Sequence, residues 1–409
     1  MDNRVVVTGM AAITALGSDW AAFSKRLRQR ESGIRYMHDW DRYANLHTRL
    51  AAPVPAFEVP AHYPRKKTRA MGRVSLLATR ACEQALIDAG LLGDALLTSG
   101  AVGVAYGSST GSPDATRDFS RMLISDDMSG VTATTYIRLM SHTAAVNIGV
   151  FFGLQGRIIP TSSACTSGSQ GIGYAYEAIR SGRQVAMLAG GAEELCVTEA
   201  AVFDTLYATS TRNDQPGLTP RPFDRDRDGL VIGEGAGTLV LEALDHALAR
   251  GATIHAELVG FGTNSDGGHV TQPNAPTMKV AMQLALADAG LDAGAIGYVN
   301  AHGTATERGD IAESRATAEL FGSAMPLSTL KGNLGHTLGA CGAIEAWATI
   351  HMMKEGWFAP THNLINPDPR CAELDYLQGS GRHFDAEYVM SNNFAFGGIN
   401  TSLVFRRWA

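Results

Sequence analysis

A weak twofold internal repeat constrains the fold of this 409-residue chain more than any other feature of its sequence. Three pairs of segments resemble each other: residues 4–10 and 258–262, residues 102–107 and 296–303, and residues 163–182 and 335–356. A repeat of this kind places equivalent turns from both copies around one shared centre. We therefore expect two halves, residues 1–255 and 256–409. Because no low-complexity linker separates them, they should form one compact body.

Each half alternates short apolar runs with segments of helical periodicity. The pattern predicts strands over residues 4–10, 100–106, 184–191 and 238–244, and helices over residues 74–89 and 167–180. Strands that alternate with helices form parallel or mixed sheets whose faces are covered by those helices. The sequence therefore predicts a fold of the α/β class.

The composition excludes several classes of protein. Hydrophobic residues make up 45% of the chain and charged residues 18%, which is typical of a globular protein with a large core. The net charge of −6 gives no reason to expect a nucleic-acid partner. No run approaches the ~20 apolar residues that span a bilayer, and the first residues lack the apolar core of a signal peptide. We expect no membrane association and a cytoplasmic location.

Five scattered cysteines, an odd number with no CxxC pair, argue against a disulfide framework or a zinc site. Cys165 lies in Ser-Ser-Ala-Cys-Thr-Ser-Gly, between a predicted strand and a predicted helix. The free N–H groups at a helix N-terminus favour a thiolate, so this turn predicts a low pKa for Cys165. An inert buried thiol is the alternative. Cys341, in a glycine-rich turn, is the one rival nucleophile, and we expect Cys82, Cys196 and Cys371 to be packing residues.

Three further segments place glycine beside histidine, threonine or phenylalanine at predicted strand ends. His302 lies in Asn-Ala-His-Gly-Thr-Ala-Thr, and His336 ends Lys-Gly-Asn-Leu-Gly-His. The third segment, Ser391-Asn-Asn-Phe-Ala-Phe-Gly-Gly-Ile-Asn, supplies backbone N–H groups that could face a developing oxyanion. A single loop histidine is more often structural than catalytic, but two in similar turns indicate a shared site.

Together, the cysteine turn and these three segments resemble the β-ketoacyl-acyl-carrier-protein synthases of the elongating type, in the thiolase superfamily. Cys165, His302 and His336 are similar to the Cys-His-His triad of that family, and residues 393–400 to its glycine-rich loop. The resemblance runs from Val5 to the C-terminus, with the motifs in the same order. It implies a thiolase-like, duplicated fold of α-β-α-β-α layers. It also implies decarboxylative condensation of an acyl thioester with malonyl-carrier, extending a fatty-acid, polyene or polyketide-like chain.

The resemblance implies a role for each matching residue. Cys165 would take the acyl group as a thioester, with the backbone N–H groups of Cys165 and Phe396 as the oxyanion hole. His302 and His336 would polarise the malonyl thioester carbonyl while carbon dioxide leaves. Two further groups, Lys331 and Glu313, would belong to the network that organises the histidines.

Five positions match the family's contacts to the phosphopantetheine arm and the nucleophile. Thr304, Thr306 and Thr271 would hydrogen-bond the arm, although each threonine could instead cap a turn. Phe394 would lie near the nucleophile, and Phe396 would act as a gate. No metal and no bound cofactor are expected, because the substrates arrive on the phosphopantetheine of an acyl carrier protein.

The loop Gly107-Ser-Ser-Thr-Gly-Ser matches a loop that helps to shape the family's acyl pocket. Thr110 falls where elongating enzymes often carry a bulkier apolar or a smaller residue. A polar side chain there argues against ordinary long saturated chains, while the choice between a primary and a specialised pathway stays open.

Acyl carrier proteins are acidic, so the resemblance implies a local basic patch on this chain. Lys66 and Arg69, in Arg-Lys-Lys-Thr-Arg, and Arg212, in Thr-Arg-Asn-Asp, are the candidate docking residues. A solvated charged face is the alternative. The resemblance also implies a homodimer, while a heterodimer with a related ketosynthase-like subunit stays open.

Three alternative functions each require particular residues, which can be checked in the sequence. Thiolases use a second cysteine near the C-terminus, whereas the C-terminal loop here contains Phe-Ala-Phe-Gly-Gly and no cysteine. Synthases that resemble chalcone synthase use Cys-His-Asn, which the Lys331 to His336 segment argues against. A chain-length-determining partner subunit would lack the nucleophile, whereas Cys165, His302 and His336 are all present.

Overall fold

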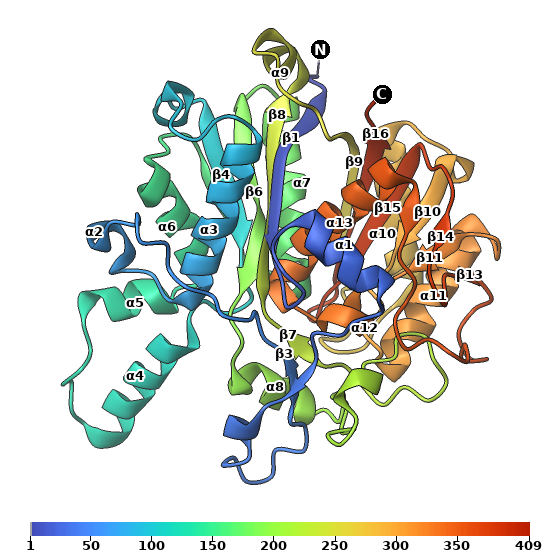
Figure 1. The fold of residues 1–409 in the computed structure, drawn as a ribbon, viewed down its shortest axis with the longest axis horizontal. Coiled ribbons are helices and arrows are strands. Elements are labelled where there is room, and N and C mark those ends of the chain that lie inside the picture. The colour runs from blue at the N-terminus through green and yellow to red at the C-terminus, as the bar shows by residue number, and fades with distance from the viewer. Residues whose placement is uncertain (1) are drawn as a thin grey trace.

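The structure, a computed structural model, describes residues 2–409 and contains one sheet of eleven strands, with two small sheets beside it (Figure 1). The strands of the large sheet are β1 (Val5–Ile13), β4 (Val102–Gly107), β5 (Ile158–Thr161), β6 (Ala186–Glu193), β8 (Gly235–Ala243), β9 (Ala256–Ser265), β10 (Ile296–Asn300), β11 (Pro326–Ser328), β13 (Asp375–Tyr376), β15 (Tyr388–Phe394) and β16 (Ile399–Arg407). The small sheets contain β2 (Arg35–Tyr36), β3 (Leu50–Ala52) and β7 (Ile232–Gly233), and β12 (Trp357–Phe358) with β14 (Arg382–His383).

Helices occupy most of the segments between the strands. The α-helices are α1 (Trp20–Arg28), α2 (Arg65–Thr68), α3 (Arg73–Asp88), α4 (Pro113–Ser125), α5 (Ala133–Leu139), α6 (Thr143–Phe152), α7 (Ser167–Arg180), α8 (Val197–Asp204), α9 (Leu244–Ala249), α10 (Ala275–Ala289), α11 (Glu307–Phe321), α12 (Lys331–Leu334) and α13 (Cys341–Glu355). Short 3-10 turns are η1 (His38–Trp40), η2 (Ala95–Thr98), η3 (Ala164–Thr166), η4 (Pro216–Leu218), η5 (Ala293–Ala295) and η6 (Leu338–Ala340).

The large sheet has an internal symmetry that matches the sequence repeat. Its N-terminal part runs β5-β4-β6-β8-β1, and its C-terminal part runs β11-β10-β15-β16-β9. Strand β13 lies at the edge of the sheet, next to β11. The two parts meet where β1 and β9 pair antiparallel, with Val5 opposite Leu258. In both parts the repeated segment forms a strand, β4 or β10, with parallel neighbours on both sides. The predicted duplication is therefore confirmed, while the division of the chain at residue 255 stays a prediction.

Helices cover the sheet in layers, as the α/β prediction requires. The central helices α7 and α13 contact each other and strands of both parts of the sheet (Figure 1). On the outer faces, α3 and α6 pack on the N-terminal strands, and α10 packs on β9, β16 and α11. Helix α13 is buried on all sides, which explains its continuous apolar run around Trp347. The layers follow the order α-β-α-β-α.

The predicted elements exist with shifted boundaries. Helices predicted over residues 74–89 and 167–180 correspond to α3 and α7, and the strand predicted over 184–191 is β6, which begins and ends two residues later. The first strand continues to Ile13, because β1 pairs with β8 along its whole length, from Val5 opposite Ala243 to Ile13 opposite Ala236.

Residues 113–139 form an arm, α4 and α5, that projects from the body and that the sequence analysis did not predict (Figure 1). Its side chains Leu123, Ile124 and Met128 are strongly exposed. These apolar side chains do not indicate a transmembrane segment, since no helix within residues 2–409 has the length and hydropathy to cross a bilayer.

Candidate active site

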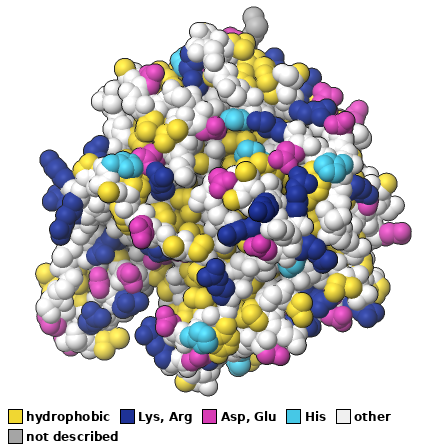
Figure 2. All heavy atoms as spheres, in the orientation of Figure 1, with side chains coloured by type: hydrophobic (Ala, Val, Ile, Leu, Met, Phe, Trp, Pro, Cys, Tyr) yellow, Lys and Arg dark blue, Asp and Glu magenta, His cyan; other side chains and the backbone are white. Residues whose placement is uncertain are grey.

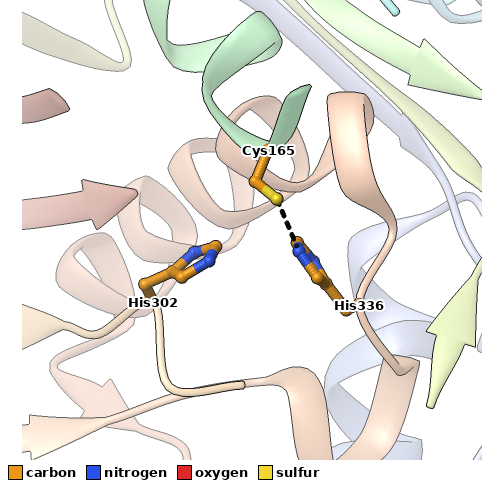
Figure 3. A group of neighbouring side chains, drawn as sticks. All are labelled: Cys165, His302 and His336. Atoms are coloured by element: carbon orange, nitrogen blue, oxygen red, sulfur yellow. Dashed lines mark hydrogen bonds between the residues drawn. The ribbon is translucent and has the colours of Figure 1, made fainter. Parts of the chain in front are cut away.

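Three side chains from separate turns meet at one point (Figure 3). Cys165 lies in η3 directly before α7, His302 follows β10, and His336 lies between α12 and α13. The Nε2 atom of His336 lies 3.0 Å from Sγ of Cys165. The rings of the two histidines are 5.0 Å apart between centroids and nearly perpendicular, at 86°. The fold therefore brings the three predicted turns together, and all three side chains are buried.

The backbone around Cys165 forms the sharp turn that the sequence predicts. Ala164 has a φ of +51°, in the left-handed region that few residues adopt. The hydroxyl of Ser167 accepts a hydrogen bond from the N–H of Ser163 at 3.0 Å and donates one to the carbonyl of Ala164 at 2.7 Å. These two bonds hold the turn, and the predicted position of Cys165 between a strand and a helix is confirmed.

The predicted low pKa of Cys165 is wrong. Burial has the largest effect and raises the pKa of this thiol to about 12. The charge of Lys331 and the backbone N–H groups of Phe396 and Cys165 lower the pKa, but they do not offset the loss of hydration. A helix N-terminus does favour the thiolate, but here it acts on a sulfur that has almost no contact with water. The resting group is therefore a neutral thiol.

Both histidines are neutral as well. Burial lowers the pKa of His302 and of His336 well below the usual 6.5, and the charge of Lys331 lowers both further. A neutral imidazole carries one N–H donor and one acceptor nitrogen. The site can therefore donate hydrogen bonds from its histidines without placing a positive charge on either ring.

Lys331 is the buried cation beside these groups. Its Nζ atom forms an ion pair with Glu345 on α13. Burial alone would lower the pKa of Lys331, but the carboxylate of Glu345 raises it above its usual value. Asn393 donates a hydrogen bond to the second oxygen of Glu345 at 2.7 Å, and its amide nitrogen lies 3.5 Å from Nδ1 of His302. A continuous polar chain therefore links Lys331 to His302.

Sequence reasoning missed two members of this chain, Glu345 and Asn393. Glu345 could have been found as a carboxylate within the apolar run of residues 341–355, since a charge in such a helix needs a partner. Asn393 lay inside the glycine-rich segment, but nothing in the sequence distinguished it from its neighbours. Their positions follow from the packing of α13 against β15.

Glu313 contacts the backbone next to His302. Its two carboxyl oxygens accept hydrogen bonds from the N–H groups of His302 and Gly303, both at 2.7 Å. Burial raises the pKa of Glu313 to about 8, although these N–H groups lower it. The predicted network residue thus fixes the loop that carries His302, with no contact to the imidazole itself.

The three side chains open into a cavity of about 520 Å³. Its lining includes Cys165, His302, His336, Thr271, Thr304, Thr306, Phe394 and Phe396. The hydroxyls of Thr304 and Thr306 lie 2.9 Å apart. The cavity therefore brings most of the sequence-predicted site residues to one surface.

The loop after β15 places Phe396 over the nucleophile. The backbone N–H groups of Phe396 and Cys165 both face Sγ of Cys165. The ring of Phe396 lies 5.1 Å from that of Phe203 on α8, between centroids. Two glycines with positive φ, Gly397 at +87° and Gly398 at +71°, follow Phe396 and turn the chain back into β16.

The rival thiol lies behind the nucleophile. Cys341 is buried at the start of α13, and its Sγ donates a hydrogen bond to the carbonyl of Cys165 at 3.2 Å. Burial, followed by the charge of Glu345, raises the pKa of Cys341 well above its usual value. Cys341 does not belong to the lining of the cavity described above.

Four predicted contact residues lie away from the cavity lining. Thr110 is exposed in the loop after β4. Lys66 and Arg69 are exposed at α2, where Lys and Arg side chains gather at the left edge of the molecule (Figure 2). Arg212 lies nearer the mouth of the cavity, 3.6 Å from the lining residue Asp228.

The same cluster is the group that could hold a metal ion among residues 2–409, because the candidate ligand atoms of Cys165, His302 and His336 lie within 4.8 Å of one another. A metal would require the thiol to lose its proton first, which its raised pKa opposes. The expectation that the site uses no metal stays a prediction.

Comparison with known proteins identifies a family from two successive parts of the chain. Residues 2–247 match the family Beta-ketoacyl synthase, N-terminal domain, and residues 255–365 match Beta-ketoacyl synthase, C-terminal domain. The chain is 38% identical to 3-oxoacyl-[acyl-carrier-protein] synthase 2 of Vibrio cholerae over 413 residues, 99% of each chain.

Solved structures agree with this family. A crystal structure of a β-ketoacyl synthase from Burkholderia phymatum superposes with a TM-score of 0.99 at 65% identity and covers 100% of both chains. The ishigamide ketosynthase/chain length factor superposes with a TM-score of 0.91 at 32% identity, again over 100% of both chains. The chain therefore belongs to the β-ketoacyl synthase family and is an acyltransferase that joins acyl units into 3-oxoacyl thioesters.

Proposed function

We propose that Cys165 receives an acyl group from an acyl carrier protein and that a malonyl unit on the same kind of carrier then attacks this thioester. The observation that carries the proposal is the 3.0 Å approach of His336 to Sγ of Cys165 at the base of a cavity that also contains His302. A buried thiol beside a neutral imidazole can lose its proton only as it attacks, so the thiolate forms in the transition state.

The oxyanion of this acyl transfer lies between the backbone N–H groups of Cys165 and Phe396. Both donors are fixed, one by the turn before α7 and the other by the Gly397–Gly398 turn. Donors that are held in place before the reaction stabilise the developing charge without reorganisation. Phe396, which packs near Phe203, is in position to act as the gate over the nucleophile.

His302 and His336 donate hydrogen bonds to the malonyl thioester carbonyl. Carbon dioxide leaves, and its bonding electron pair forms the enolate whose oxygen the two imidazoles stabilise. The enolate carbon attacks the acyl carbon, the bond between that carbon and Sγ of Cys165 breaks, and the leaving thiolate takes a proton from water. Neutral imidazoles suit this task because the negative charge on oxygen develops only in the transition state. Lys331 and Glu313 are positioning residues. Lys331 acts on His302 through Glu345 and Asn393, and Glu313 holds the backbone of the loop that carries His302.

The arm of the carrier enters past the cavity threonines. Thr304, Thr306 and Thr271 line the same opening, and their hydroxyls are the donors available to the amides of phosphopantetheine. Phe394 lines the cavity beside His302, with ring centroids 6.3 Å apart. Both substrates arrive on this arm, so the chain itself needs no resident cofactor.

We propose a homodimer through the edge strand β5, with a heterodimer of related subunits as the alternative. Ile158 of β5 is 43% exposed at the end of the sheet. The arm α4–α5, which contacts β5's neighbour α6, exposes apolar side chains as well. A second copy on this edge would cover both, and would bring Thr110 from the exposed surface into a shared acyl pocket.

Lys66 and Arg69 of α2, with Arg212, are the proposed docking cations for an acidic carrier.

Mass spectrometry after incubation with an acyl-carrier thioester tests the reaction. The acyl adduct should lie on Cys165, and Cys165→Ala should abolish condensation. Cys165→Gln should leave malonyl decarboxylation, since both histidines remain. An adduct on Cys341, or no adduct on either cysteine, would remove the assignment.

A further inference from the structure

Two buried glutamates near Cys165 have no role in the chemistry proposed above. Glu193 is the last residue of β6, and Glu199 lies in the first turn of α8. Both are buried, and the Oε1 atom of each lacks a hydrogen-bond partner within residues 2–409. A buried polar atom without a partner costs free energy, so two of them beside an active site call for a ligand or another explanation.

Glu193 is fixed against the turns that surround the nucleophile. Its Oε2 atom accepts hydrogen bonds from the backbone N–H groups of Ser109 at 2.8 Å and Gly339 at 2.9 Å. Gly339 belongs to η6, whose Leu338 packs in one apolar cluster with Cys165. The charge of Glu193 is also one of the causes that raise the pKa of Cys165. Glu193 therefore lies close to the reacting thiol.

Glu199 approaches the same region from α8. Its Oε2 atom accepts a hydrogen bond from the N–H of Cys196 at 3.3 Å, and the next residue, Ala200, packs in the apolar cluster that contains Cys165. Burial, followed by the charge of Glu193, raises the pKa of Glu199 well above its usual value, and burial raises the pKa of Glu193 to about 7. The two carboxyls therefore keep at least one proton near neutral pH, and together they offer both a donor and acceptors.

Two serine hydroxyls on the neighbouring segments are unpartnered as well. Ser109, whose backbone holds Glu193, has a buried Oγ atom without a hydrogen-bond partner in the described part of the chain. Ser163, two residues before Cys165, is 8% exposed, and its Oγ atom is likewise unpartnered. The two segments are joined, because the hydroxyl of Ser162 donates to the carbonyl of Ser109 at 3.4 Å. Four unpaired oxygens thus belong to segments that meet beside the nucleophile.

We propose that this polar cluster (Glu193, Glu199, Ser109 and Ser163) binds an oxygen-bearing substituent, a hydroxyl or a carbonyl, on the acyl chain that Cys165 holds. The inference rests on the proposed function, because the chain reaches the cluster only as the thioester of Cys165. None of the four residues lines the cavity proposed as the path of the arm, so the acyl chain and not the arm is the ligand.

The chemistry of the cluster makes the enzyme selective for an oxygenated chain. An unsubstituted chain leaves all four oxygens unpaired, whereas a hydroxyl group can donate to a carboxyl oxygen and accept from a protonated carboxyl. A carbonyl group can accept from the same proton or from a serine hydroxyl. A site built to hydrogen-bond one group of its substrate rejects the analogue that lacks this group.

Acylation rates of Cys165 test this selectivity. Octanoyl groups, unsubstituted or with a hydroxyl or a carbonyl at one of carbons 4 to 8, are supplied on the same carrier, and mass spectrometry of the intact protein follows the adduct. In the wild type, the best oxygenated donor should react about tenfold or more faster than octanoyl at equal concentration. Glu199→Leu should bring this ratio to about one. Glu199→Gln keeps hydrogen-bonding atoms and should retain most of the ratio.

Glu194→Gln is the matched control. Glu194 is also buried, and burial raises its pKa to about 7, but its carboxylate accepts a hydrogen bond from the N–H of Val74 at 2.8 Å. This variant should keep the wild-type ratio. Thermal unfolding shows whether each variant is folded, and the comparison of donors on the wild type decides the proposal if Glu199→Leu does not fold.

Each other outcome overturns the proposal. A wild type that reacts with octanoyl as fast as with every oxygenated donor would mean that the four oxygens bind water only. A ratio that survives in folded Glu199→Leu would place the recognition elsewhere. A ratio that Glu194→Gln also abolishes would mean a general disturbance of the buried acids. Failure of the proposed function appears differently, because Cys165 would then carry no adduct from any donor.

Discussion

Lys331 and Glu345 form an ion pair that is buried beside both histidines of the site. The pair comes from two successive elements, α12 and α13, which also flank His336. Asn393 extends it from Glu345 toward His302. Burial has the larger effect on the pKa of both imidazoles, and the lysine of this pair lowers it further. The same pair joins the turns that carry the two rings.

Removing one partner of this pair should destabilise the fold strongly. Lys331→Met leaves the Glu345 carboxylate buried without its cation, and loss of one partner of a buried pair costs about 3–5 kcal/mol. Combining Lys331→Met with Glu345→Leu removes both charges and should recover most of this loss. Urea unfolding of the two single variants and the double variant checks the cycle. Additive losses would show that the two side chains do not act as a pair.

The neutral histidines predict an unusual pH dependence. Because burial and then Lys331 lower the pKa of His302 and His336, both imidazoles should stay unprotonated throughout pH 6 to 8. Activity should therefore show no acidic limb near 6.5, and NMR signals of both rings should not shift over that range. The double variant Lys331→Met with Glu345→Leu removes both charges, and its rings should still be neutral because burial is the larger cause. An imidazole that titrates near 6.5 would contradict the site's electrostatics.

The thiol of Cys165 should react slowly with a small electrophile. With a pKa of about 12, raised mainly by burial, little thiolate exists at pH 8. Its higher intrinsic nucleophilicity offsets only part of this loss, so alkylation by iodoacetamide should be about tenfold or more slower than that of an ordinary cysteine peptide. The rate should rise up to pH 10 without a plateau. Peptide mapping with Cys165→Ala as the control assigns the modified residue, and a plateau below pH 8 would mean that a thiolate is already present.

The duplicated layer architecture and the convergence of Cys165, His302 and His336 could be predicted from the sequence, because each relies on a local pattern. A strand followed by a glycine-rich turn and a helix is readable over ten residues, and the repeat shows that such turns face one centre. The catalytic roles of these residues came from the family resemblance, because a hydrophobic pattern indicates secondary structure and not chemistry.

Two kinds of feature could not be predicted because they depend on packing at long range. The partners Glu345 and Asn393 become part of the site only when α13 packs against β15. The pKa of Cys165 depended on how much water its turn would keep, and the local rule for helix N-termini gave the wrong sign. Similarly, nothing near Tyr207 in the sequence indicates its left-handed backbone, with a φ of +53°, in the lining of the Cys165 cavity.

A buried carboxyl away from the triad should make stability fall as the pH rises. Burial raises the pKa of Glu194 from 4.5 to about 7. The folded state therefore binds more protons than the unfolded state between these values, and stability is highest below 4.5 and is lost as the pH rises through 7. Glu194→Gln removes this proton. Its stability relative to wild type should improve by about 3 kcal/mol between pH 4.5 and 8, in line with 1.36 kcal/mol for each pKa unit. Urea unfolding at several pH values measures the difference, and a constant difference would contradict the raised pKa.

The two threonines at the entrance should act as one unit in substrate binding. Their hydroxyls lie 2.9 Å apart, so each orients the other, and both threonines line the cavity that we propose as the path of the arm. A neutral hydrogen bond contributes about 0.5–1.5 kcal/mol, so Thr304→Val should raise the KM for carrier-borne malonyl roughly two- to tenfold, with little change in kcat. Because Thr306→Val breaks the same hydroxyl pair, the double variant should lose much less than the product of the single effects. Steady-state kinetics of the four proteins measures this coupling. If the single effects simply multiply, each hydroxyl binds the arm independently. If the threonines only cap a turn, the variants should lose thermal stability while their KM values stay unchanged.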